Sequence, residues 1–128
     1  MTKSDAHEAQ SWTVRILDHS GASEDAIVEN IPKFLDLAHA NAFARAYVRD
    51  SMERGRVRGA SPRDVIENWY SFGEDAVVVD AGDDGWRSAN ELDDFAANPA
   101  TPMERDWRAL DPRRLIEEDD EFFPEGEG

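Results

Sequence analysis

The residues whose spacing best suits metal chemistry lie in the loop 80–91. This loop aligns in part with a calcium-binding EF-hand loop, in which oxygen ligands recur around a turn glycine that Gly85 supplies here. The aligned ligand positions hold Asp80, Asp84, Ser88 and Glu91. The third ligand position holds Gly82, which has no side-chain oxygen, and the preceding segment is strand-like. A turn followed by a helix cap explains the same residues, so we predict no metal and no other cofactor, with this loop as a weak calcium candidate.

No other set of residues predicts catalysis. The three histidines are His7, His19 and His39. No two of them have the spacing that would place both on one face of a helix or strand as metal ligands. His19 follows Asp18, but neighbouring residues at a strand end point to opposite faces and cannot form a general-base pair. Glu74 and Asp75 stand near Asp80, which chance explains in a chain this acidic. The sequence therefore predicts a protein that is not an enzyme.

The C-terminal segment 117–127 is the strongest candidate for binding. It carries seven acids, no base and two adjacent phenylalanines. The candidate partner-binding residues are Trp107, Glu117, Glu118, Asp119, Asp120, Glu121, Phe122 and Phe123. An acidic and aromatic segment of this kind can fold on a partner. For Trp107 an equal alternative is a closing helix, residues 107–116, that packs on the sheet.

The overall charge points to the same kind of partner. The chain has 29 acids, 14 bases and a formal charge of −15, so it repels nucleic acid and anionic membranes. A basic or apolar protein surface is the expected partner, and an acidic mimic of nucleic acid is a further alternative. Six of the bases cluster in one region, namely Arg45, Arg49, Arg54, Arg56, Arg58 and Arg63. Pairing with helix acids is favoured for them over a docking patch, although the acidic tail could fold back on them.

Composition predicts one folded domain with extensions. We expect a disordered N-terminus at 1–10, an α+β domain at 11–98, a short helical extension at 99–116 and a disordered acidic tail at 117–128. The chain has no cysteine, which excludes disulfides and thiolate sites and suits the cytoplasm. No signal-like or membrane-spanning segment is present, so a cytoplasmic location is expected.

Local patterns predict the first half of the domain. Alternation of apolar and polar residues predicts a strand at 11–18, and a second strand near 26–28 would complete a hairpin. Asn30 is the expected cap of a long amphipathic helix with Pro32 in its first turn. The apolar spacing carries this helix to about Arg54, and Gly55 is the expected end.

Capping signals predict the second half. Ser61 and Asp64 form a capping-box pattern for a helix at 62–72, whose inward face we expect to hold Val65, Ile66, Trp69 and Phe72. The run 76–79 predicts a buried, central strand. The same box spacing, Ser88 with Glu91 and Thr101 with Glu104, predicts short helices at 89–97 and 102–109.

Residues 12–96 resemble a small family of uncharacterised bacterial proteins. The similarity rests on Trp12 and Val14, on the run Trp69-x-x-Phe72-Gly73-Glu74-Asp75 with the strand after it, and on Phe95-Ala96. That family has a proline where this chain has Ala76. The resemblance implies an α+β domain with an antiparallel sheet of about three strands and helices on one face. It implies no activity. The acidic surface and tail predict a non-enzymatic protein-binding or regulatory module, and the alternative is a calcium- or small-ligand-binding protein that uses the loop 80–91.

Overall fold

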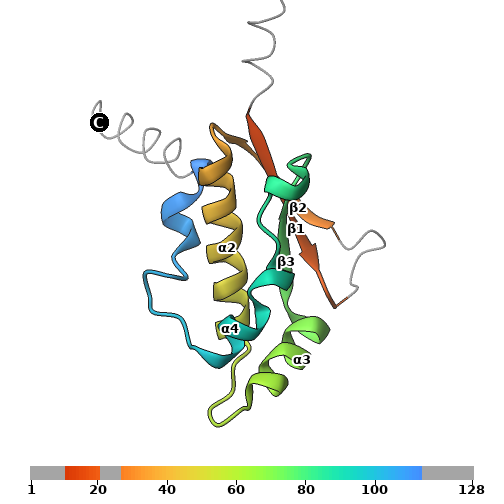
Figure 1. Cartoon of the computed structure of the whole chain (residues 1–128), viewed down its shortest axis with the longest axis vertical. Coiled ribbons are helices and arrows are strands. Elements are labelled where there is room, and N and C mark those ends of the chain that lie inside the picture. Colours follow the sequence, from red (N-terminus) through yellow and green to blue (C-terminus); the bar gives the residue numbers. More distant parts are fainter. Residues whose placement is uncertain (1–10, 21–26, 114–128) are drawn as a thin grey trace, which may run out of the picture.

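The computed structural model describes residues 11–20 and 27–113, which form an α+β domain (Figure 1). Its strands are β1 (Trp12–Asp18), β2 (Ile27–Phe34) and β3 (Glu74–Val78), and its α-helices are α2 (Leu37–Arg54), α3 (Pro62–Phe72) and α4 (Leu92–Ala97). Short 3-10 helices occur at Gly82–Asp84 (η1), Ser88–Asn90 (η2) and Trp107–Leu110 (η3). The expected disordered N-terminus at 1–10 and acidic tail at 117–128 lie outside the described residues, and the expected extension at 99–116 is described as far as residue 113.

The sheet is antiparallel with the strand order β2-β1-β3. Val14 and Ile16 of β1 are fully buried because both neighbouring strands and a helix cover them. The prediction of a central strand at 76–79 was wrong, since β3 is an edge strand and β1 is central. The apolar run reflects burial of Ala76 and Val78 beneath α2 rather than pairing on both sides.

β2 is longer than predicted, and this changes how α2 begins. The strand continues through Asn30 to Phe34 because Ile31 and Phe34 have buried side chains. Asn30 therefore does not cap the helix, and that prediction was wrong. Pro32 lies within an edge strand, where proline is tolerated. Asp36 is the cap, and its Oδ1 accepts a hydrogen bond from the His39 amide at 2.7 Å.

The main helix α2 confirms the predicted end at Arg54, followed by Gly55. It packs along one face of the sheet, as predicted, while η3 lies against its other side (Figure 1). A Cβ at Gly55 would come within 2.3 Å of Asn68 Nδ2, so glycine permits the close approach of α3 there.

The helix α3 is capped as the sequence predicts. Ser61 Oγ accepts from the Asp64 amide at 3.1 Å, and the Asp64 carboxylate accepts from the Ser61 amide. Val65 and Trp69 are buried, but the inward orientation expected for Phe72 was wrong, because its side chain is 73% exposed.

The segments after β3 depart most from the capping predictions. The region 89–97 is split into η2 and α4, and no side-chain hydrogen bond caps α4. Thr101 and Glu104 do exchange the two hydrogen bonds of a capping box. Only turns and η3 follow them, so the predicted helix at 102–109 is a single 3-10 turn at 107–110.

Candidate functional site

Glu91, the last aligned calcium ligand, is engaged inside the domain. It accepts from Arg45 Nε at 2.8 Å and Arg45 Nη2 at 2.9 Å, and from Trp86 Nε1 at 2.6 Å. The Arg45 guanidinium, helped by the Trp86 indole, lowers the pKa of Glu91. Its carboxylate therefore links the loop to α2 and is not directed at an open site.

The other aligned positions do not gather around a common point. Ser88 donates to Asp75 Oδ2 at 3.2 Å instead of capping α4, whereas Asp80 and Asp84 are exposed. Asn41 of α2 fastens the loop by donating to the Asp84 carbonyl and accepting from the Trp86 amide. Within residues 11–20 and 27–113, no group of three or more His, Asp or Glu side chains is arranged to hold a metal ion.

Trp107 packs on α2 rather than on the sheet. Its ring lies 5.9 Å from that of Phe43 and 5.0 Å from that of Tyr47, and its Nε1 donates to Asp50 Oδ2 at 3.1 Å. His39 Nε2 lies 2.6 Å from the Leu110 carbonyl oxygen, which holds the other end of η3. The structure therefore gives Trp107 a packing role within the domain. The remaining candidates, 117–123, lie outside the described residues.

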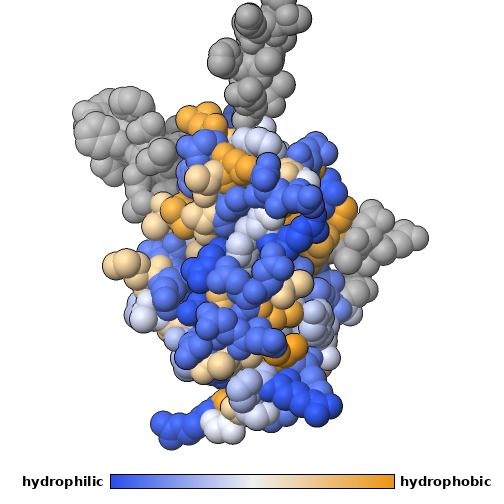
Figure 2. Space-filling model, in the orientation of Figure 1, coloured by the Kyte–Doolittle hydropathy of each residue, from blue (hydrophilic) through white to orange (hydrophobic). Residues whose placement is uncertain are grey.

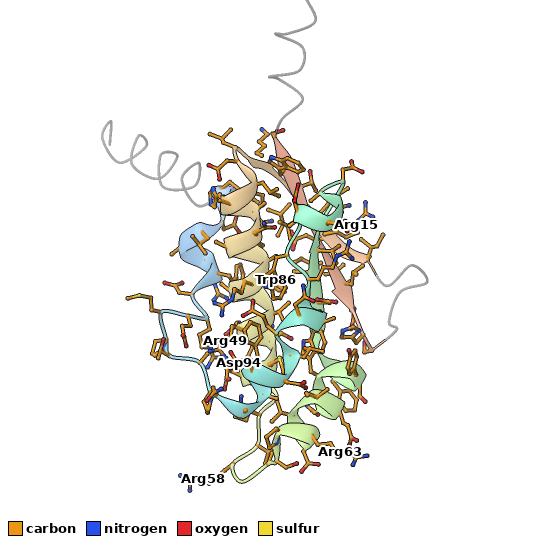
Figure 3. The ribbon with its side chains drawn as sticks, viewed as in Figure 1. Arg15, Arg49, Arg58, Arg63, Trp86 and Asp94 are labelled. Atoms are coloured by element: carbon orange, nitrogen blue, oxygen red, sulfur yellow. The ribbon has the colours of Figure 1, made fainter. Side chains whose placement is uncertain are left out.

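Three of the clustered arginines are used to join elements. Arg45 binds Glu91. Arg49 donates to the Asn98 carbonyl at 2.8 Å, and its guanidinium lies over the ring of Phe95, a residue of α4 (Figure 3). Arg56 donates to Glu53 and to the carbonyls of Ala96 and Phe95. These contacts support the structural interpretation for this half of the cluster.

The other three arginines are exposed. Arg54 pairs with Asp50 and Arg63 with Glu67, each within its own helix. Arg58 has no ion pair among the residues that the structure describes. Figure 3 shows Arg58 and Arg63 directed outward at the end of the domain where α2 connects to α3. Exposed pairs contribute little energy, so this end remains available to an anion.

This exposed end is also hollowed. One cavity of about 260 Å³ is lined by residues that include Arg54, Asn68 and Phe72, and a second of about 360 Å³ by residues that include Val57 and Asn68. Gly55 and Asn68 line both, and Asn68 Nδ2 donates to the Gly55 carbonyl at 3.1 Å, so the two hollows adjoin on either side of this contact in a shallow depression between α2 and α3. Sequence reasoning missed it because Phe72 was expected to point inward.

Two buried polar contacts also escaped the sequence analysis. Tyr47 Oη donates to Glu74 Oε1 at 2.5 Å, and burial together with this carboxylate raises the pKa of Tyr47. Burial raises the pKa of Asp75, whose Oδ1 accepts from the Ala76 amide at 2.8 Å. No sequence spacing predicts the first contact, since Tyr47 belongs to α2 and Glu74 to β3. Both carboxylates belong to the first two residues of β3.

The visible surface is largely hydrophilic (Figure 2). Among the described residues, no helix has both the length and the apolar character that a membrane span needs. Comparisons with protein-family models, with curated proteins and with solved structures found no match to this chain.

Proposed function

We propose that this protein is a non-enzymatic protein-binding module of the cytoplasm, whose acidic surface and tail bind a basic partner. The observation that carries the proposal is that the domain uses many of its arginines internally and leaves acids outside. Each internal pair removes one acid together with one base, so the surface presented to a partner keeps the net negative charge of the chain.

The clearest acidic surface follows β3. Residues 80–100 contain six acids and one base, Arg87. Five of these acids are exposed and form no ion pair with any described residue, namely Asp80, Asp83, Asp84, Asp93 and Asp94. We name these five residues the acidic surface. Three of them lie around η1 and two on α4, and uncompensated acids on a domain surface attract a basic protein and accelerate association at low salt.

The tail would extend this contact. Its seven acids have the same sign as the domain, so their favourable contacts are with bases. Phe122 and Phe123 would supply an apolar anchor that charge alone lacks, because exposed charge pairs are weak and screened by salt.

The test is affinity capture with three chains at two salt concentrations. The full chain is compared with a chain ending at residue 116 and with a variant in which Asp83, Asp84, Asp93 and Asp94 are replaced by Asn. We expect a basic protein to be enriched by the full chain and reduced by both changes. About 1 M salt, where the Debye length is about 3 Å, should mimic them.

A matched control keeps the net charge constant. The double variant Arg63→Gln and Glu67→Gln removes one exposed pair and should retain the partner. If both acid-depleted chains captured the same proteins as the full chain at low salt, the proposal would be wrong. Enrichment of a DNA-binding protein that added DNA displaces would instead identify a nucleic-acid mimic.

A further inference from the structure

The depression between the end of α2 and α3 borders an arginine-rich stretch of the chain. We define the α2–α3 groove as the two adjoining hollows, one lined by Arg54 and Phe72 and the other by Val57 and Arg58, with Asn68 between them. Residues 54–63 contain four arginines and no acid, in a chain with twice as many acids as bases. This contrast makes the groove the natural place for an anionic segment.

Not all four arginines face outward, but the exposed ones are enough to bind an incoming carboxylate. Arg56 points inward to Glu53. Arg58 has no ion pair within the described part of the chain, and the pair between Arg54 and Asp50 leaves the Arg54 side chain 54% exposed. Asp64 and Glu74 also line the hollows, so an incoming carboxylate would bind on the Arg54 and Arg58 side.

The groove also offers apolar surface. Phe72 is 73% exposed and Val57 is 69% exposed, so both present apolar surface to an incoming side chain. An aromatic ring at such a place prefers offset or edge contacts with another aromatic ring. A segment that combines acids with aromatic residues would match both features of the groove.

We propose that the acidic segment 117–127 of this same chain binds the α2–α3 groove. The acids from Glu121 onward would face Arg54 and Arg58, and Phe122 and Phe123 would pack on Phe72 and Val57. The segment combines the two features that the groove would recognise.

The chain is long enough for this contact. Arg113, the last described residue, binds Glu29 of β2, and Leu110 contacts the first turn of α2. The groove lies at the opposite end of this helix, whose 18 residues span about 27 Å. Phe122 is nine residues beyond Arg113 and can reach about 30 Å when extended. A tethered segment of this length has an effective concentration in the millimolar range, which favours even a weak contact.

The contact would mask the tail. While 117–127 occupies the groove, its acids and phenylalanines are withheld from any basic partner, and a strongly basic protein would have to displace them. This inference goes beyond the proposed function, since the tail could bind the groove whether or not a partner exists.

The absence of cysteine permits a direct test. A paramagnetic label is attached to the single cysteine of the Glu125→Cys full-length chain, and amide signals are recorded by NMR. We expect loss of intensity for the amides of Gly55, Val57 and Phe72, and none for that of Arg87. About 1 M salt should restore the signals.

Two groove variants and two surface controls decide the assignment. Arg58→Glu and Phe72→Ala change exposed side chains and should each restore the groove signals, whereas Arg87→Glu and Met103→Ala should not. Unchanged groove signals at low salt, or broadening that survives both groove variants, would overturn the proposal. Broadening that appears only when labelled and unlabelled chains are mixed would place the contact between copies and would also overturn it.

The two proposals can fail separately. Capture of a basic protein without groove broadening refutes the inference and leaves the proposed function standing. Groove broadening without capture of a partner supports the inference and refutes the proposed function.

Discussion

Arg45 donates to both carboxylate oxygens of Glu91, at 2.9 and 2.8 Å, across 46 positions of sequence. The pair ties the middle of α2 to the residue that begins α4, and the Trp86 indole shares the same carboxylate. One side chain thus joins three segments.

Replacing Glu91 with Ala should lower the free energy of unfolding by about 1–2 kcal/mol, because Arg45 and the Trp86 N–H lose a charged acceptor. A loss near the lower end of this range is expected, because the Arg45 side chain is 39% exposed and solvent weakens its pair with Glu91. Urea unfolding measures the difference. Glu67→Ala is the matched control, since its pair with Arg63 is mostly exposed and should contribute less than about 0.5 kcal/mol. Equal losses for the two variants would contradict this role.

Calcium at about 1 mM should leave the thermal unfolding temperature unchanged, because recruiting Glu91 as a ligand would break its pair with Arg45. Calorimetric titration provides a second measurement. A dissociation constant of about 1–10 µM that Asp80→Asn and Asp84→Asn both abolish would restore the calcium interpretation.

Asp75→Asn should raise the unfolding temperature at neutral pH. Burial raises the pKa of Asp75, so its contribution to stability is complete below the pKa of the unfolded chain and is lost as the pH rises through the raised value. Asn carries no charge and retains an acceptor for the Ala76 amide. The advantage of the variant should vanish below about pH 4, where the carboxyl is protonated.

Thermal melts at several pH values test this sign. Asp93→Asn, a change at an exposed carboxylate, is the control and should show no such pH-dependent gain. A variant that is less stable than the parent at neutral pH would show that the charge itself is needed.

Trp107→Ala should destabilise the domain by about 2–3 kcal/mol, less than a fully buried tryptophan, because the ring packs on Phe43 and Tyr47 and bonds Asp50. Met103→Ala, at a side chain that is 85% exposed, should change stability by less than about 0.5 kcal/mol. Denaturant unfolding distinguishes the two. A stable Trp107→Ala chain that fails to capture a partner would instead assign this residue to binding.

Asp36→Ala should cost about 1 kcal/mol, since it removes the side-chain acceptor at the start of α2. Asn30→Ala removes only an exposed hydrogen bond with Arg15 and should cost less than about 0.5 kcal/mol. Urea unfolding of both variants measures the difference from their midpoints, provided that the dependence of the unfolding free energy on urea concentration is the same. The reverse order would return the cap to Asn30.

Three identical spacings show how far local sequence can predict. Ser61 with Asp64 and Thr101 with Glu104 exchange the two hydrogen bonds of a capping box, whereas Ser88 with Glu91 does not. In the third case Arg45 takes the carboxylate and Asp75 takes the hydroxyl. The pattern is local, but its outcome depends on which distant groups compete for the same atoms.

The sequence alone determined the class of fold, the alternation of buried and exposed residues in β1, the end of α2 and the extent of α3, because these follow from periodicity and capping within a few residues. Tertiary structure decided that β3 lies at the edge, that Phe72 is exposed and that Trp107 packs on α2. It also decided which arginines pair and which remain outside. These features depend on contacts between segments tens of residues apart, where burial and hydrogen-bond competition across the whole domain outweigh any local preference.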